Sequence, residues 1–336
     1  MIPRSKTAFV TGGTGFLGYE LIQQLLARRH RVLALSRNGF LPGDLPKAPL
    51  EIVRGDLDDT KVLEEVMRGV GVVYHVAANV QMWTKRRAES EHVNVLGTRN
   101  MVRAALAAQV DRFIFTSTGS TIGKPYPPTK EIVTVDETSE YNFARFNMVY
   151  PHTKWLAELE VLQGVKEGLH AVITHPTAVF GPGDWKANVL PLFLATRTFA
   201  GFAVPRGIRT TCDVRDVATA HIVAAEKAPA GRRYILGGEV VSVEELFTRV
   251  ARVVNGKAPR LTLPNWAISS VARMMEFGAG LSGRPPKVSY EMALQSTLRV
   301  RLSSQRAAEE LGYASRPLDE SIRDMATFYR EQGWLK

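Results

Sequence analysis

The 336-residue sequence is poor in cysteine and in long apolar runs. Its single cysteine, Cys212, cannot form a disulfide within the chain, which fits a reducing compartment and excludes a disulfide-stapled fold. The longest apolar stretch, 189–204, is interrupted by Pro191 and Arg197, so we expect no membrane-spanning helix. The first residues lead directly into a strand-like run without an apolar core or cleavage site. We therefore expect no secretory signal and a cytoplasmic protein.

Acidic residues are also in the minority, with 33 Asp and Glu against 43 Lys and Arg and a net charge of +10. Most of this excess, +7, lies in residues 181–336. Solubility alone accounts for such a charge, and attraction for anionic ligands or for an anionic membrane surface are the alternatives, so peripheral membrane contact stays open. No basic–aromatic motif of a nucleic-acid-binding domain is present, so we expect no nucleic-acid partner.

In the first half of the chain, short apolar runs alternate with helical patterns. Several runs are continuous in Val, Ile and Phe, as strands buried on both faces require. Their β–α order predicts an α/β fold with a parallel, doubly wound Rossmann sheet. The predicted strands are 7–11, 32–36, 51–54, 70–77, 112–117 and 171–175, and the predicted helices are 16–28, 60–67, 93–108 and 150–167.

Beyond residue 180 the alternation weakens. We predict a Rossmann domain over 1–180 and a smaller, C-terminal substrate-binding region over 181–336, with about 211–230 returning to the Rossmann domain. Residues 181–210 are predicted as loop and short helix. The remaining predictions are helices 214–228, 243–254 and 265–281 and strands 233–236 and 261–263.

A glycine-rich segment, TGGTGFLG, follows the first predicted strand and opens the first predicted helix. Gly12, Gly15 and Gly18 are spaced three residues apart, which allows a sharp turn and close approach of the backbone to a pyrophosphate. The helix that follows supplies unpaired N–H groups and positive potential for the same phosphates. With a strand before it and a helix after it, the segment predicts a dinucleotide-binding loop.

The second predicted strand ends at Ser36 and Arg37, where the adenosine ribose is read. An acidic residue there would bond the 2′-hydroxyl of NAD and repel a 2′-phosphate. A guanidinium instead binds phosphate by two charge-assisted hydrogen bonds. We therefore predict NADP(H) as cofactor, with NAD as the alternative. Asp56, after the third strand, is placed to accept a bond from the adenine amino group.

A Tyr-x-x-x-Lys pair, Tyr150 and Lys154, begins the helical pattern that follows the fifth strand. The i, i+4 spacing places both side chains on one face of the helix. An ammonium nearby favours phenolate, so we expect it to lower the pKa of Tyr150 and make the hydroxyl a usable acid and base near neutral pH. His75 is interpreted as structural, and His152 as a bystander or a contact on the substrate side.

Over essentially its whole length the chain resembles the extended short-chain dehydrogenase/reductase family. The resemblance rests on the motifs TGGTGFLG, GDLDD, HVAA, NVLGTRN, FIFTSTGSTIG, YPHTK and HPTAVFGP. It implies a carbonyl or alcohol redox step, and it suggests a homodimer formed through helix packing.

The resemblance also implies individual roles. Thr118 aligns with a third catalytic hydroxyl that is more often serine in the family, and Ser117 and Ser120 stay open for that role. Asn94 matches an asparagine that holds the active-site backbone, and 175–179 matches a segment that contacts nicotinamide. The predicted catalytic residues are Thr118, Tyr150 and Lys154, and no metal ligand is predicted. The predicted cofactor contacts are Gly12, Thr14, Gly15, Phe16, Leu17, Gly18, Ser36, Arg37, Asp56, Leu57, Ala77, Ala78, Asn94, Tyr150, Lys154, Pro176 and Val179.

Three segments resemble the branch of dihydroflavonol reductases, 3β-hydroxysteroid dehydrogenases and hopanoid-associated epimerase-like proteins: AANVQMW, YILGGEVVSVEELF and the closing run from 303. That branch implies an apolar, ring-containing or lipid-like substrate. The Trp- and Met-rich segment 265–281 agrees with it, or else forms an ordinary core helix. Two alternatives remain. One is a nucleotide-sugar epimerase or dehydratase, favoured by Arg209 and the basic second half. The other is a non-catalytic NADP(H) sensor, disfavoured by the retained Tyr–Lys pair.

Overall fold

Seven parallel strands form the central sheet of the computed structural model, which describes residues 6–46, 49–127, 129–146, 148–198, 201–286 and 288–336. The strand order is β11-β7-β5-β4-β1-β2-β3, so the winding direction reverses between β1 and β4. In such sheets ligands bind at that reversal, beyond the carboxyl ends of the strands. The strands are β1 (Thr7–Thr11), β2 (Arg31–Ser36), β3 (Leu50–Arg54), β4 (Val72–His75), β5 (Arg112–Thr116), β7 (Ala171–Pro176) and β11 (Arg233–Leu236).

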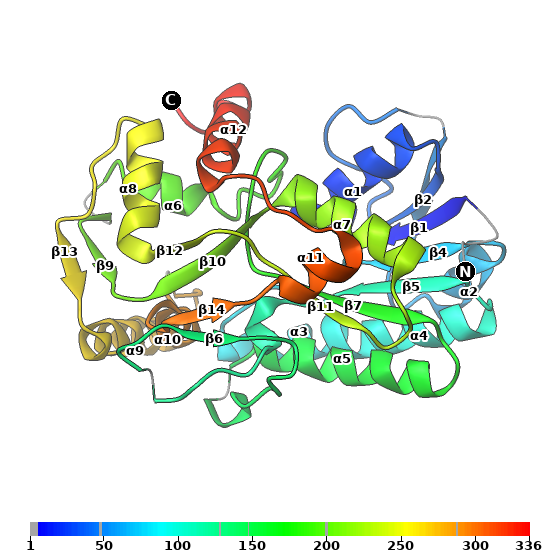
Figure 1. Cartoon of the computed structure of the whole chain (residues 1–336), viewed down its shortest axis with the longest axis horizontal. Coiled ribbons are helices and arrows are strands. Elements are labelled where there is room, and N and C mark those ends of the chain that lie inside the picture. The colour runs from blue at the N-terminus through cyan, green and yellow to red at the C-terminus, as the bar shows by residue number, and fades with distance from the viewer. Residues whose placement is uncertain (1–5, 47–48, 128, 147, 199–200, 287) are drawn as a thin grey trace.

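Helices cover both faces of this sheet, with α1 and α7 on one side and α4 and α5 on the other (Figure 1). Alternate residues of each strand enter the two cores, as the period of a strand requires. On β1, Val10 packs with α1, α7 and α11, whereas Phe9 packs with α2, α4 and α5. These helices are α1 (Phe16–Ala27), α7 (Val214–Lys227), α11 (Gln305–Leu311), α2 (Thr60–Met67), α4 (Gly97–Ala107) and α5 (Tyr150–Lys166).

A second region surrounds a small three-stranded sheet, β12-β10-β8. Its core is built largely by helices α6, α8 and α12, which lie together at one corner of the molecule (Figure 1). The elements are β8 (Ala178–Phe180), β10 (Ile208–Asp213), β12 (Val240–Ser242), α6 (Leu190–Ala195), α8 (Val243–Val253) and α12 (Leu318–Glu331).

Two pairs of short parallel strands and a helical pair complete this region. Strand β6 pairs with β14, and β9 pairs with β13. Helices α9 and α10 pack against each other at the end of the molecule far from α2 (Figure 1). The elements are β6 (Val133–Val135), β14 (Val300–Leu302), β9 (Ala203–Pro205), β13 (Leu261–Leu263), α9 (Asn265–Ser282) and α10 (Tyr290–Ser296).

The predicted fold class is confirmed, and the predicted elements of the first half end within about two residues of the observed ones, with one exception. The predicted helix 93–108 is wrong at its start, because a π-helical segment, His92–Leu96, precedes α4 and follows α3 (Arg87–Glu91). The predicted loop over 181–210 is also wrong in part, since β9 and the start of β10 lie there. The remaining short helical turns are Thr84–Arg86, Gly119–Thr121 and Ala144–Phe146.

Candidate active site

The glycine-rich loop joins the end of β1 to the start of α1 in a conformation that only small residues allow. Gly12 has a φ of +78°, and a Cβ there would lie 2.7 Å from the backbone nitrogen of Ala77. A Cβ on Gly18 would lie 2.2 Å from the Gly12 carbonyl oxygen, so loop and helix are in direct backbone contact. A Cβ on Gly15 would meet only that same oxygen, at 3.2 Å, and would otherwise fill open space beside the helix start.

No side chain caps the N-terminus of α1, which begins at Phe16 after Gly15. The N–H groups of a helix's first turn have no partner within the helix, and the helix dipole adds positive potential there. An open cradle beside an uncapped helix end is what a pyrophosphate requires, so the residues present fit a dinucleotide. Thr14 and Leu17 belong to the same loop and first turn.

At the carboxyl end of β2, the two predicted ribose-reading residues differ in what their side chains do. The Ser36 hydroxyl is buried and donates to the Phe40 carbonyl oxygen at 2.7 Å, which closes the turn after the strand. The Arg37 side chain is exposed, and no hydrogen bond or ion pair with the described residues engages its guanidinium. Arg37 is therefore free to bind an anion at this position, whereas Ser36 holds the turn.

The loops after β3 and β4 leave the same carboxyl edge of the sheet as the glycine-rich loop. The Asp56 carboxylate accepts the Leu57 N–H at 2.7 Å, and Leu57 is buried. The Ala77 N–H donates to the Thr11 hydroxyl at 3.2 Å, which holds the loop after β4, and with it Ala78, against the end of β1. Both alanines are partly exposed there.

Asn94, in the π-helical segment, connects that loop to helix α5. Its side-chain amide donates to the Asn79 carbonyl oxygen and to the Thr153 hydroxyl, each at 2.9 Å. Its carbonyl oxygen accepts the Asn79 N–H at 2.7 Å. π-Helical turns often occur at functional sites, and here the turn points an amide at both sides of the crevice. Pro176 ends β7 of the central sheet, and Val179 lies in β8 of the three-stranded sheet.

Tyr150 and Lys154 stand on the first turns of α5, where Tyr150 is partly exposed and Lys154 is buried. Lys154 is 1% exposed, and its ammonium lies 4.0 Å from the centre of the Phe115 ring. The Thr118 hydroxyl forms a hydrogen bond with the Tyr150 side chain. Thr118 begins the short turn after β5 in extended geometry. The structure thus brings the three predicted catalytic residues together at the carboxyl end of the sheet.

Burial dominates the proton affinities of this trio. It raises the pKa of Tyr150 to about 12, although the hydrogen bond from Thr118 acts in the opposite direction. It also lowers the pKa of Lys154 to about 7, although the Glu158 carboxylate opposes this shift. The expectation that the ammonium would lower the pKa of Tyr150 is therefore wrong for the protein alone. The cost of burying charge outweighs attraction between the two groups.

Ser117 and Ser120, the alternatives to Thr118 as the third catalytic hydroxyl, form hydrogen bonds with other side chains. Ser117 donates to the buried Glu158 carboxylate at 2.5 Å, and Ser120 donates to the Gln295 side chain at 3.0 Å. Glu158 also bonds His175 at 3.1 Å and Arg233 at 3.2 Å. This network lies one helical turn beyond Lys154 and fixes that part of α5 against the sheet.

A buried glutamate that the sequence analysis missed lies against the start of α5. The Glu291 carboxylate, on α10, accepts the Val149 N–H at 2.7 Å and a hydrogen bond from the Tyr150 backbone N–H. Burial raises the pKa of Glu291 to about 8. When it is ionised, its charge raises the pKa of Tyr150. No local sequence signal could reveal it, because 141 residues separate it from Tyr150.

The histidines around the site have structural partners. Both ring nitrogens of buried His75 contact hydroxyls, Thr11 at 2.8 Å and Thr98 at 2.9 Å, and burial lowers the pKa of His75 to about 3. His152 packs against the rings of Tyr141 and Trp155. The partners of these two histidines thus do not include the Tyr150 hydroxyl among the described residues.

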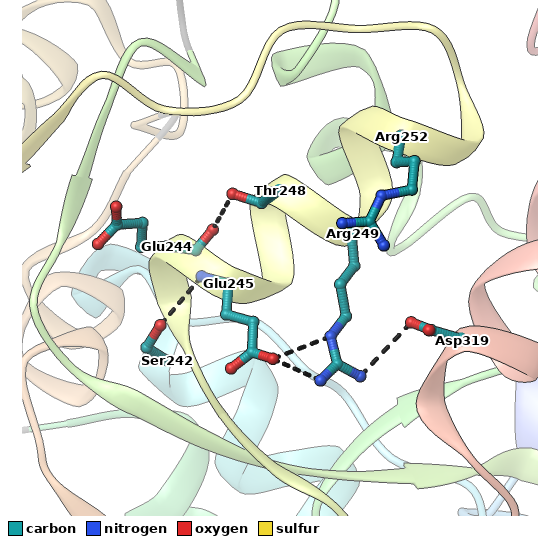
Figure 2. A pocket seen from close by; sticks show the side chains of 7 residues that line it. All are labelled: Ser242, Glu244, Glu245, Thr248, Arg249, Arg252 and Asp319. Carbon is teal, nitrogen blue, oxygen red and sulfur yellow. Dashed lines mark hydrogen bonds and ion pairs between the residues drawn. The ribbon is translucent and has the colours of Figure 1, made fainter.

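A pocket of about 400 Å³ lies elsewhere, on α8 and α12 (Figure 2). Among its lining residues Arg249 pairs with Glu245 and Asp319, and it also pairs with Glu239 nearby. Glu244 and Arg252 complete the charged lining, which contains none of the predicted site residues. Within the described ranges no group of three His, Cys, Asp or Glu is arranged to hold a metal ion.

Comparison with known proteins agrees with this geometry. The family model described as "NAD dependent epimerase/dehydratase family" matches residues 8–237. A putative dihydroflavonol 4-reductase of Synechocystis is 31% identical over 98% of this chain and 96% of its own. Sterol demethylase protein B of Methylococcus capsulatus is 28% identical, over 98% and 100%. A farnesyl-dihydroquinoline-oxide ketoreductase of Stigmatella aurantiaca is 30% identical over 92% of each chain.

Among solved structures, a protein named gox2253 superposes with a TM-score of 0.84 and 31% identity, covering 99% of this chain and 100% of that one. The family match spans the phosphate loop, the Tyr–Lys pair and the last strand of the central sheet. The chain therefore belongs to the NAD dependent epimerase/dehydratase family, and it is an NAD(P)-dependent oxidoreductase of the kind that acts on CH–OH groups.

Proposed function

We propose that the protein interconverts a ketone and a secondary alcohol on an apolar, ring-containing or lipid-like substrate, with NADP(H) as cofactor. The observation that carries the proposal is the contact of Thr118 with Tyr150, one helical turn from buried Lys154, beside the dinucleotide crevice. A retained acid–base group at this position also argues against a non-catalytic sensor.

The residues divide the proton chemistry among them. When bound, the nicotinamide supplies or accepts the hydride. In reduction, negative charge develops on the carbonyl oxygen, Tyr150 donates its proton to that oxygen, and Thr118 donates a second hydrogen bond to it. Lys154 would hold the ribose hydroxyls and, while protonated, favours the phenolate left on Tyr150. Because burial keeps Tyr150 protonated at neutral pH, reduction is the direction for which this residue is already prepared.

NADP(H) is preferred in this proposal because of Arg37. Its exposed guanidinium follows β2, and no acidic side chain occupies that position to repel a 2′-phosphate. We propose further that the enzyme works in the cytoplasm as a homodimer. No helix among the described residues has the length and apolar character needed to span a bilayer.

The substrate class is supported by the names of two relatives. The sterol demethylase protein B and the farnesyl-bearing quinoline ketoreductase both carry apolar ring systems in their names. Both align with more than nine-tenths of this chain, including the second half that would surround a substrate.

A nucleotide-sugar epimerase or dehydratase is the second candidate, favoured by two partly buried cations, Lys124 and Arg209. Burial lowers the pKa of Lys124 to about 7 and that of Arg209 to about 10, and the charge of Arg209 depresses the pKa of Lys124 further. Lys124 donates to the carbonyl oxygens of Gly119 and Ile122, and Arg209 donates to that of Gln295. Neighbouring cations of this kind suit an anionic substrate.

A turnover screen distinguishes the two candidates. Steroid-like, flavonoid-like and long-chain ketones would be tested with NADPH and NADH, beside a panel of nucleotide sugars, by following nicotinamide absorbance and by separating the products, epimers included, by chromatography before their mass is measured. We expect reduction of at least one apolar ketone. Turnover of nucleotide sugars alone would establish that the protein is a nucleotide-sugar epimerase or dehydratase. Tight cofactor binding without turnover of any candidate would favour the sensor.

A further inference from the structure

Helix α9 turns its apolar side toward solvent, the reverse of an ordinary surface helix. Trp266, Met274, Phe277 and Leu281 are 74%, 75%, 72% and 77% exposed. Successive members are 8, 3 and 4 residues apart, which places them on one side of a helix with 3.6 residues per turn. We call these four residues, with Val271, the α9 apolar face.

The opposite side of α9 is the one that packs on the protein. Ala272 and Ala279 are buried there, seven residues and two turns apart. The two charged residues of the helix are taken up by α10: Glu276 accepts the Tyr290 N–H at 2.9 Å, and Arg273 lies over the Tyr290 ring. An ordinary core helix is one of the two alternatives that the sequence leaves open for residues 265–281. That alternative is wrong, because the large side chains of the helix are exposed to solvent.

The segment around the α9 apolar face is strongly basic. Residues 255–289 contain five Lys and Arg and a single acid, Glu276. Exposed Arg260 precedes the helix and exposed Arg284 follows it, so positive charge stands at both ends of the apolar stripe. Apolar side chains, a tryptophan and flanking cations together are the composition of helices that lie in the interface of an anionic bilayer.

The helix that packs against α9 also contacts the active site. Helix α10, which follows α9, carries Glu291 against the backbone of Val149 and Tyr150 and Gln295 against Ser120. Lys85, in the short turn Thr84–Arg86, donates to the Gly280 carbonyl oxygen of α9 at 2.9 Å. A lipid-like substrate that leaves a bilayer beside α9 would thus arrive next to the helix that touches the start of α5.

We propose that α9 docks the protein on the surface of an anionic membrane, with the α9 apolar face in the boundary between headgroups and acyl chains. The delivery of substrate by this route rests on the proposed function, but the docking itself does not.

The test is co-sedimentation of the full-length protein with vesicles of phosphatidylglycerol and phosphatidylcholine, compared with phosphatidylcholine alone. We expect the wild type to bind the anionic vesicles and to be released by high salt, because screening weakens attraction between surface charges. The triple variant Met274→Ser, Phe277→Ser, Leu281→Ser should bind at least about tenfold more weakly. The double variant Arg260→Gln, Arg284→Gln should lose a similar factor on anionic vesicles only.

A control triple, Ile132→Ser, Leu159→Ser, Leu194→Ser, removes apolar side chains that are 46%, 43% and 42% exposed on other elements and should bind as the wild type does. The docking proposal fails if the wild type does not sediment with anionic vesicles, or if both triples bind equally. Sedimentation equilibrium gives the rival outcome: a dimer that the α9 triple alone dissociates, without vesicle binding, would identify a self-association face.

These results are separable from the proposed function. A Tyr150→Phe variant should bind vesicles normally and lose turnover. The α9 triple should lose vesicle binding and retain turnover of a short, water-soluble ketone.

Discussion

At the scale of single residues, burial sets the pKa values of the ionisable groups in the site, because it disfavours their charged forms. Burial raises the pKa of Tyr150 to about 12 and lowers the pKa of Lys154 to about 7, and Glu291 lies close enough to influence both the start of α5 and the phenol. Shifts of this size at one place mark a functional site more often than a structural one. Two predictions test individual residues of this cluster and its cofactor side.

Glu291→Gln should stabilise the protein at alkaline pH. Burial raises the folded-state pKa of Glu291 to about 8, above its ordinary value, so the folded state holds a proton that the unfolded state releases. Stability therefore falls as pH rises from about 4.5 to about 8 in the wild type, and the neutral amide escapes this loss. At pH 8.5 we expect the free energy of unfolding of the variant to exceed that of the wild type by about 1–3 kcal/mol, so that the variant unfolds at a higher temperature. At pH 5 the two proteins should unfold at nearly the same temperature.

The same substitution should move the alkaline limb of the pH–rate profile to lower pH, because the charge that raises the pKa of Tyr150 is removed. Thermal unfolding and rate profiles from pH 5 to 10 check both effects. Equal unfolding temperatures at pH 8.5 would contradict a buried, ionising Glu291.

Arg37→Ala should remove the preference for NADP(H). The Arg37 guanidinium is exposed and engaged by no described residue, so the substitution costs little stability and loses one charge-assisted phosphate contact. We expect the dissociation constant for NADPH to rise about tenfold and that for NADH to change less. Titration of both cofactors by fluorescence measures this, and tighter NADH than NADPH binding by the wild type would contradict the assignment.

At the scale of elements, the sequence predicted those whose residues carry a strong local pattern. The continuous apolar runs of β1, β4 and β5 and the glycine loop were recognisable because buried parallel strands and phosphate loops have distinctive compositions. Strands β6 and β14 are three residues each and exist only because they pair with each other across 165 residues of chain. Glu291 was hidden for the same reason, since its role depends on where α10 packs.

The junction of the phosphate loop and α1 gives the prediction at this scale. Gly18→Ala would place a Cβ 2.2 Å from the Gly12 carbonyl oxygen, which must separate the helix from the loop. We expect a loss of about 2–4 kcal/mol in stability and more than about tenfold in cofactor affinity. Gly278→Ala in α9 is the matched control, because its Cβ meets nothing within 4 Å. That variant should gain about 0.5–1 kcal/mol, and equal behaviour of the two variants would refute the close contact.

At the scale of the whole molecule, the two halves of the chain supply different parts of one site. The first half carries the glycine-rich loop, Thr118, Tyr150 and Lys154, whereas α10 in the second half brings Glu291 against the start of α5 and Gln295 against Ser120. The basic excess of the second half lies in the same part of the chain as the exposed face of α9. In the proposed function, the first half holds the cofactor and the second half receives the substrate.

In the proposed mechanism Tyr150 donates and accepts the proton of the redox step, so turnover of Tyr150→Phe is the decisive measurement. The substitution keeps the ring and its packing and removes only the hydroxyl, so cofactor affinity, measured in parallel, should stay within about twofold. We expect kcat on the substrate found in the screen to fall by about 10²–10⁴-fold. A Tyr150→Phe enzyme that keeps full kcat with unchanged cofactor binding would show that another group moves the proton.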